Sequence, residues 1–300
     1  MFWNNLKHRI HELCKHNKNQ DELINMFIQF AHLLLHNKSH PQLKDIIQQH
    51  QDINVEDVWH HLYQVRSSHR NDNILVDNMK KSLEMIKLMN IVIIRVYEMK
   101  NVTFDLFNSE HILLLNELWN NLRPDLPRSL IDENNNVNTN IITPDWVEIG
   151  FQGNDPTTDF RGMGILGLTQ LYYFSRNRNQ AARLILQVFT QEKSRYYPFA
   201  IIGINITRFL LDLIEENRIQ KLLIENLGHS LAADLHTYQI LPSADPICIE
   251  FGLNVINDIY CIIFEEFYLQ WVIANPVNIM SFSAIFDQVK LSIRNKYPVL

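Results

Sequence analysis

Glycine and cysteine are scarce in this chain, and long basic or hydrophobic runs are missing. The 300 residues include eight glycines and three cysteines. Cys14, Cys248 and Cys261 are widely spaced and form no C-x-x-C pair, so we expect free thiols and a cytoplasmic protein without a disulfide framework. The formal net charge is −6 without a cluster of Lys and Arg, which argues against nucleic acid as a partner.

No stretch of the sequence predicts a transmembrane segment. Residues 89–97 are apolar but too few to cross a bilayer, and residues 255–273 include Asp258 and two glutamates. The N-terminus lacks the apolar run of a signal peptide. Its mixed apolar and basic side chains, which begin with Phe2 and Trp3, predict a docked terminal helix. Peripheral association with a membrane through this segment is the alternative.

Apolar residues recur at spacings of three and four almost throughout the chain, which is typical of amphipathic helices and predicts an all-α multi-helix bundle. The expected helices cover 20–36, 54–63, 74–100, 109–122, 180–189, 197–217, 218–227, 229–240 and 278–295, with one of nearly thirty residues beginning at Pro246. Thr143-Pro144 and Asp155-Pro156 each combine a capping side chain with a proline at the first helical position. The Asn-rich segment 132–140 predicts an exposed loop.

Five of the eight glycines fall within residues 150–167, and three of them, Gly162, Gly164 and Gly167, form a G-x-G-x-x-G pattern. A dinucleotide site is excluded because no buried strand precedes the pattern and no acid follows about 20 residues later. A kinase glycine loop is excluded because the V-A-I-K, H-R-D and D-F-G motifs are absent. The chain also lacks a G-x-x-x-x-G-K-[ST] motif, so we expect no GTP site of its own.

Two interpretations of the glycine cluster remain. In the structural one, Gly164 and Gly167 let a helix that starts near Ile165 pack closely, and Arg161 pairs with Asp155 or Asp159.

In the functional one, Gly162 and Gly164 leave room for another molecule, and Asp155 fixes the loop by capping it. Asp159 then orients Arg161, whose planar guanidinium is suited to stabilise charge on a transferring phosphoryl group.

Other catalytic and metal-binding patterns are weak. His32 and His36 are spaced for one helix face, but the residues between them lack the glutamate of a zinc-protease motif, and His60-His61 cannot both face one ion from a helix. We therefore expect no metal site. No G-x-S-x-G motif is present, and no Cys, His and acid form a recognisable triad.

Residues 146–168, WVEIGFQGNDPTTDFRGMGILGL, closely resemble the central signature of the ELMO domain. The match follows W-x-x-x-G-F-Q-G-x-D-P-x-T-D-F-R-G-x-G-x-L-G-L and is far more specific than three spaced glycines. The resemblance extends over about residues 106–295. It implies an ELMO domain at 106–300, preceded by an N-terminal helical extension at 1–105.

The resemblance also implies a function. Small ELMO domain-containing proteins act as GTPase-activating proteins for Arf and Arf-like small GTPases through an arginine of this motif, which here corresponds to Arg161. The larger ELMO scaffolds lack that arginine. Gln152 and Asp159 are then expected to hold the arginine or its loop, and GTP and Mg²⁺ to come with the partner. Such a partner implies a cytoplasmic protein, with peripheral association with internal membranes as a further expectation.

Three aromatic residues of the signature, Trp146, Phe151 and Phe160, are expected to anchor the loop from the core. Two alternatives to the catalytic function stay open. The first is a non-catalytic adaptor or effector that binds small GTPases or their regulators through the same surface. The second is a structural helical protein with no GTPase partner.

Overall fold

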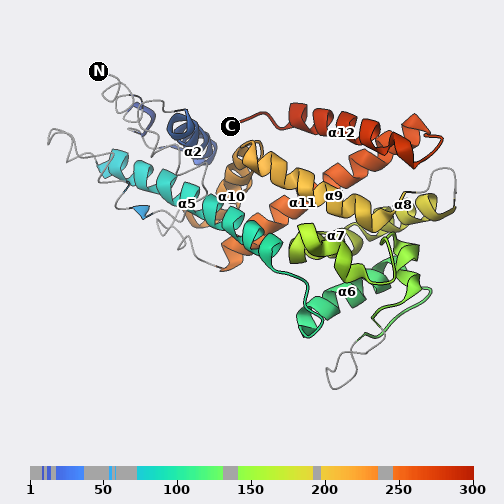
Figure 1. Cartoon of the computed structure of the whole chain (residues 1–300). Helices are drawn as coiled ribbons and strands as arrows, with labels where there is room; N and C mark the ends of the chain where they lie inside the picture. The colour runs from blue at the N-terminus through green and yellow to red at the C-terminus, as the bar shows by residue number, and fades with distance from the viewer. Residues whose placement is uncertain are drawn as a thin grey trace. The chain divides into compact units, whose positions relative to one another are not determined.

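The computed structural model of the chain describes residues 9, 12–14, 18–36, 54–55, 58, 73–130, 141–191, 197–235 and 246–300. All regular structure in these ranges is helical, and no strand occurs within them, which confirms the all-α prediction (Figure 1). The loop expected at 132–140 and most of the helix expected at 54–63 lie outside the described residues, as do His60-His61 and residues 1–8.

The chain divides into two compact units. Unit 1 comprises residues 1–95, 214–256 and 298–300, and unit 2 comprises residues 96–213 and 257–297. The predicted boundary between an N-terminal extension and an ELMO domain at residue 105 stays a prediction.

Unit 1 contains α2 (Gln20–Leu35), most of α5 (Asn73–Asn101), α10 (Gln220–Leu235) and the first part of α11 (Pro246–Ala274). Helix α2 begins after Asn19, whose side chain accepts a hydrogen bond from the Glu22 backbone N–H at 3.0 Å. This cap satisfies a donor that the first helical turn leaves free. The apolar stripe of α2, including Phe27 and Phe30, is fully buried.

Gly228 corrects one predicted helix boundary. It does not separate two short helices at 218–227 and 229–240 but lies inside the single helix α10. A Cβ at this position would come within 2.7 Å of Ile24 Cγ1, so the missing side chain gives α2 room to pack against α10. The glycine serves close helix packing, and reading it as a helix end is wrong.

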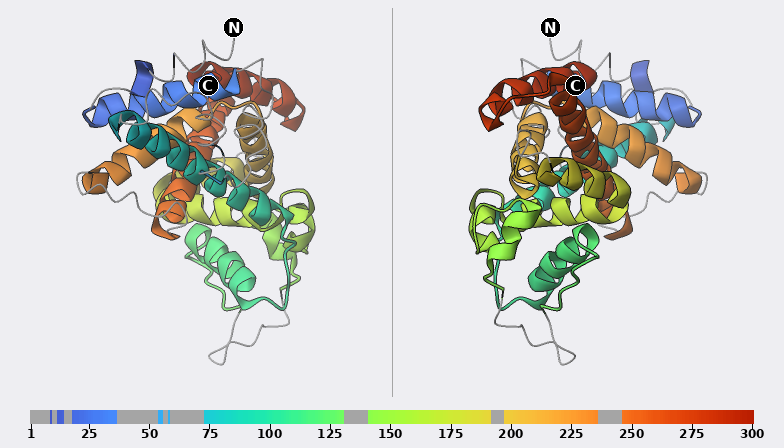
Figure 2. Two further views of the ribbon diagram at one scale, coloured as in Figure 1. Left: turned by 90° about the vertical axis from the view of Figure 1, so that its left-hand side faces the viewer. Right: turned by 90° about the vertical axis from the view of Figure 1, so that its right-hand side faces the viewer.

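Unit 2 contains α6 (Ser109–Leu122), α7 (Gly164–Asn177), α8 (Asn179–Gln191), most of α9 (Phe199–Glu215), the second part of α11, and α12 (Phe282–Lys296). Its described residues also include the short 3₁₀ helices η1 (Pro144–Ile149), η2 (Pro156–Gly162) and η4 (Ile279–Ser281). Figures 1 and 2 place α6 and α12 at opposite ends of this unit.

The core of unit 2 is aromatic. The ring centroids of Phe174 and Phe264 lie 4.6 Å apart, and Phe199 lies 4.9 Å from Phe264. Helix α11 has the predicted length, at 29 residues, and by length and apolar composition alone it could cross a membrane. Its residues Phe267 and Trp271 are nevertheless fully buried, Phe267 against Phe282 and Trp271 against Tyr197, as expected of residues in a helix that packs into a core.

Candidate functional site

Arg161 lies near the end of η2, a short helix with a well-defined start. The Asp155 carboxylate accepts hydrogen bonds from the backbone N–H and the hydroxyl of Thr157, at 3.0 Å and 2.7 Å. Pro156 occupies the first helical position, where its missing N–H leaves no bond unmade. The cap and proline predicted at this position are therefore confirmed, and together they fix the turn that carries Arg161.

The Arg161 side chain is exposed. Within the described part of the chain its guanidinium takes part in no hydrogen bond or ion pair, so it is not locked to Asp155 or Asp159. The adjacent Gly162 is also exposed, and a Cβ placed on it would meet no atom within 4 Å. An approaching molecule can therefore reach the guanidinium without displacing protein atoms.

Asp159 binds the backbone that leads into this turn. Its carboxylate accepts a hydrogen bond from the Gln152 N–H at 2.9 Å. Burial raises the pKa of Asp159, and the charge of Asp155 adds to this, while the Gln152 N–H and the positive charge of Arg161 oppose it. Asp159 thus fixes the loop through a backbone hydrogen bond, and among the described residues it makes no hydrogen bond or ion pair with Arg161.

Gly164 has the close-packing role of the structural interpretation, not the role in a partner surface. It is buried with φ +54°, and a Cβ would lie 2.2 Å from the carbonyl oxygen of Lys100 and 2.6 Å from that of Val102. The following residue, Ile165, donates its N–H to the Val102 carbonyl at 2.8 Å. The expectation that Gly164 leaves room for a partner is wrong, because that space is filled by the end of α5 and the residue after it.

Trp146, Phe151 and Phe160 anchor the loop from below, as predicted. All three are at most 1% exposed. Their rings form an edge-to-face row, with centroids 5.8 Å apart between Trp146 and Phe151 and 5.5 Å apart between Phe151 and Phe160. Trp119 of α6 extends the row at 5.3 Å from Trp146. Such pairs resist sliding because the ring quadrupoles favour this geometry.

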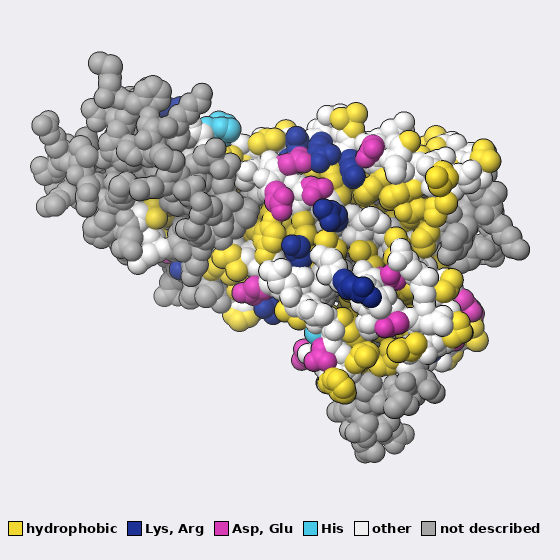
Figure 3. Space-filling view, in the orientation of Figure 1, with side chains coloured by type: hydrophobic (Ala, Val, Ile, Leu, Met, Phe, Trp, Pro, Cys, Tyr) yellow, Lys and Arg dark blue, Asp and Glu magenta, His cyan; other side chains and the backbone are white. Residues whose placement is uncertain are grey.

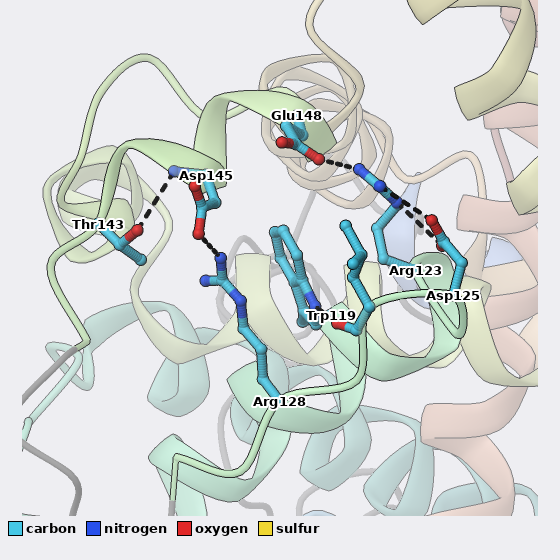
Figure 4. A network of polar contacts seen from close by, with 8 residues as sticks. Trp119, Arg123, Asp125, Arg128, Thr143, Asp145 and Glu148 are labelled. Carbon is cyan, nitrogen blue, oxygen red and sulfur yellow. Dashed lines mark hydrogen bonds and ion pairs between the residues drawn. The ribbon is translucent and has the colours of Figure 1, made fainter.

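Two arginines that sequence analysis missed hold η1 in place (Figure 4). Arg128 forms an ion pair with Asp145, and its guanidinium lies over the Trp119 ring at 3.6 Å from the centroid. Arg123 hydrogen-bonds to Glu148, the second acid of η1. Both acids of this short helix are therefore paired with cations from the segment after α6.

That segment is itself tied to α6. The Trp119 indole N–H donates to the Leu126 carbonyl at 2.7 Å. The Asn120 side chain accepts from the Arg128 N–H at 2.7 Å and donates to the Arg128 carbonyl at 3.0 Å. Arg123 also bonds twice to Asp125, at 3.1 and 3.0 Å. The sequence R-P-D-L-P-R signals a turn, but the contact with acids about 20 residues later is a tertiary feature that no local pattern encodes.

On the face drawn in Figure 3, Lys and Arg side chains are interspersed with Asp and Glu. In unit 1 the His32 and His36 rings lie 4.3 Å apart, and among the described residues no group of three His, Cys, Asp or Glu is placed to hold an ion.

Comparison with known proteins identifies the class. A profile of the ELMO/CED-12 family matches residues 95–286, and the chain belongs to this family. ELMO domain-containing protein B of Dictyostelium discoideum is 32% identical over 222 residues, which is 74% of this chain and 66% of that protein. Human ELMO domain-containing protein 2 is 35% identical over 180 residues, 60% of this chain and 51% of that protein.

Human ELMO domain-containing protein 1 is 30% identical over 219 residues, which cover 65% of this chain and 57% of that protein. These relatives fit the small ELMO domain-containing branch, as the retained arginine implies. The chain therefore spans between about half and two thirds of the length of the curated relatives it matches. No solved structure matches the chain. The ELMO-domain family is associated with the regulation of small GTPases in general.

Proposed function

We propose that this protein is a GTPase-activating protein for an Arf or Arf-like small GTPase, with Arg161 as the group that reaches the γ-phosphate of the bound GTP. The observation that carries the proposal is the exposed guanidinium of Arg161, unpaired among the described residues, on a turn fixed by the Asp155 cap. The family's association with small GTPases supports the class of partner.

The role of Arg161 in this proposal is electrostatic stabilisation of the transition state. Water attacks the γ-phosphoryl group, the bond to the β-phosphate oxygen breaks, and negative charge spreads over the transferring and leaving oxygens. A planar, permanently charged guanidinium can donate two parallel hydrogen bonds to such oxygens. Supplied in trans, an arginine of this kind accelerates hydrolysis by about 10³–10⁵, which corresponds to roughly 4–7 kcal/mol of the barrier.

The rest of the site serves to hold Arg161 in position. The guanidinium has to meet the phosphoryl group within a fraction of an ångström, because small misplacements lose most of the benefit. The Asp155 cap, the bond from Gln152 to Asp159 and the buried ring of Phe160 all constrain the backbone beside it. GTP and Mg²⁺ belong to the partner.

Single-turnover GTP hydrolysis tests the proposal. A panel of Arf and Arf-like GTPases loaded with GTP is mixed with the wild-type protein, with Arg161→Lys and with Arg208→Lys. Arg208 is a matched control because it is another exposed arginine of unit 2. We expect stimulation of at least one GTPase by the wild type and the control, and its loss in Arg161→Lys. Equal stimulation by all three proteins contradicts the proposal. Binding without any stimulation favours an adaptor.

A further inference from the structure

The segment between α5 and α6 presents a large aromatic side chain to solvent. Phe107 is 94% exposed, and Val102 at the start of the segment is 44% exposed, whereas Phe104 between them is buried. A phenylalanine this exposed is unusual, because Phe side chains are usually at least partly covered in a folded protein.

The exposure of Phe107 does not come from a loose backbone. Its N–H donates to the Asp105 carboxylate at 2.9 Å, and the Asp105 N–H donates to Nδ1 of His111 at 3.0 Å. The next residue, Asn108, caps α6 by accepting from the Glu110 N–H at 2.9 Å. Since backbone groups on both sides are bonded, the structure holds Phe107 outward.

The same segment is joined to the turn that carries Arg161. The Phe104 ring stacks on the Phe160 ring with centroids 6.1 Å apart, and Arg161 directly follows Phe160. The Val102 carbonyl accepts the Ile165 N–H at 2.8 Å, on the other side of Arg161. Chain length and the ring contact then limit the distance between the Cα atoms of Phe107 and Arg161 to roughly 30 Å. That span fits within one interface of about 800 Å² per partner.

The charges beside Phe107 indicate what can cover it. Asp105 and Glu110, its acidic neighbours, are both exposed. A complementary surface therefore has an apolar hollow bordered by Lys or Arg, because like charges placed there would repel. Aromatic side chains that fill such hollows contribute a large share of binding energy in protein interfaces.

We propose that Phe107 is an apolar anchor for the same GTPase whose nucleotide Arg161 reaches, so that one residue supplies affinity and the other supplies rate. The proposal rests on the proposed function for the identity of the partner. The two residues can be tested separately. Replacing Phe107 should raise the protein concentration needed for half-maximal stimulation, whereas replacing Arg161 should lower the maximal rate.

The experiment compares Phe107→Ala with Leu291→Ala. Leu291 is a matched control, since it is an exposed apolar residue of α12, at the other end of unit 2 from α6 (Figure 2). Binding is measured to Arf and Arf-like GTPases loaded with a non-hydrolysable GTP analogue, and stimulation is measured over a range of protein concentrations.

We expect Phe107→Ala to weaken binding and raise the half-maximal concentration by about tenfold or more, the size of an interface hot spot. The maximal rate should stay within about twofold, and Phe107→Leu should fall between the wild type and Phe107→Ala. Leu291→Ala should behave as the wild type. Equal affinities for Phe107→Ala and Leu291→Ala overturn the proposal.

The two proposals can fail separately. If Arg161→Lys stimulates as well as the wild type, the arginine mechanism is wrong, and Phe107 is still judged by affinity. If Phe107→Ala binds normally while Arg161→Lys loses stimulation, only the anchor is wrong. If the folded protein binds no GTPase of the panel, both are overturned.

Discussion

The backbone N–H of Gln152 donates to the carboxylate of Asp159 at 2.9 Å, and this bond joins the residues after η1 to the turn that bears Arg161. Because Asp159 makes no ion pair with Arg161 among the described residues, its effect on the guanidinium is mainly through the backbone.

Replacing Asp159 with Ala should therefore lower the maximal rate of stimulated hydrolysis by about tenfold or more, since a misplaced catalytic group loses much of its effect. Stability should fall by about 1–2 kcal/mol for the lost bond. Asp159→Asn keeps an oxygen acceptor and should retain most of the rate. Single-turnover kinetics and urea unfolding of both variants check this. An equally large loss in Asp159→Asn and Asp159→Ala would instead make the charge itself essential.

Gly162 and Gly164 should respond differently to the same substitution. Gly164→Ala places a methyl group against the Lys100 and Val102 carbonyls at φ +54°, and we expect it to destabilise the fold by more than about 3 kcal/mol. Gly162→Ala meets open space and should change stability by less than about 0.5 kcal/mol.

The Gly162 methyl group would, however, stand beside Arg161 on the exposed side of the turn. We expect it to raise the concentration for half-maximal stimulation while the urea midpoint stays at the wild-type value. A destabilised Gly162→Ala, or a fully stable Gly164→Ala, would show that the packing of the two glycines has been assigned the wrong way round.

The contrast between these glycines shows which features of the site can be predicted from the sequence. The caps at Asp155-Pro156 and Thr143-Pro144 could be predicted because a cap depends on residues adjacent in the chain. For Gly164 the sequence left two roles open, close packing and room for a partner, and only the fold decides for packing, because the carbonyl groups against it lie more than 60 residues earlier. Gly228 was misassigned for the same reason, since its neighbour Ile24 comes from a distant helix.

The exposure of Arg161 and of Phe107 also could not be predicted from the local sequence pattern. The signature predicts which residue types are present, but exposure depends on what the fold places over them. Phe104 and Phe107 are three residues apart and similar in sequence terms, yet one is buried against Phe160 and the other faces solvent. The difference depends on Phe160, which comes from a turn more than 50 residues later and covers only Phe104.

Arg128 should contribute more to stability than a typical surface arginine. Its guanidinium pairs with Asp145 and stacks on Trp119, so Arg128→Ala removes an ion pair and a cation–π contact together. We expect a loss of about 1–3 kcal/mol. Arg128→Lys should recover only part of this, because a lysine cannot stack and pair in the same geometry.

Arg176→Ala provides the control for Arg128, since Arg176 is exposed and lies over Tyr172 at the surface. Its removal should change stability by less than about 0.5 kcal/mol. The urea midpoints of Arg128→Ala, Arg128→Lys and Arg176→Ala test this prediction. Similar values for Arg128→Ala and Arg176→Ala would mean that η1 does not depend on the Arg128 contact.

His111 should make the Phe107 segment sensitive to acid. The His111 side chain is 8% exposed, and its Nδ1 accepts the Asp105 N–H, so the imidazole has to be neutral in the folded protein. Burial lowers the pKa of His111, although the negative charges of Asp105 and Glu110 oppose the shift. Protonation of Nδ1 would place an N–H opposite the Asp105 N–H. The hydrogen bond would then break and the segment that holds Phe107 would be released.

The sign of the pH dependence follows from the lowered pKa. Because the unfolded chain binds a proton more readily than the folded one, the contribution to stability is complete above the unfolded pKa of about 6.5 and declines as the pH falls below it. The urea midpoint should therefore drop between pH 7.5 and pH 5.5. His111→Asn keeps an acceptor for the Asp105 N–H without titrating in this range, so part of the drop should disappear.

The control for His111 is His32→Asn, because burial also lowers the pKa of His32, in unit 1. It removes another histidine whose pKa is lowered, although a more exposed one, without touching the segment that presents Phe107. GTPase affinity should therefore weaken on acidification in the wild type and in His32→Asn, and weaken less in His111→Asn. An identical pH dependence of affinity in all three proteins would mean that the Asp105–His111 bond does not hold Phe107 in its binding position.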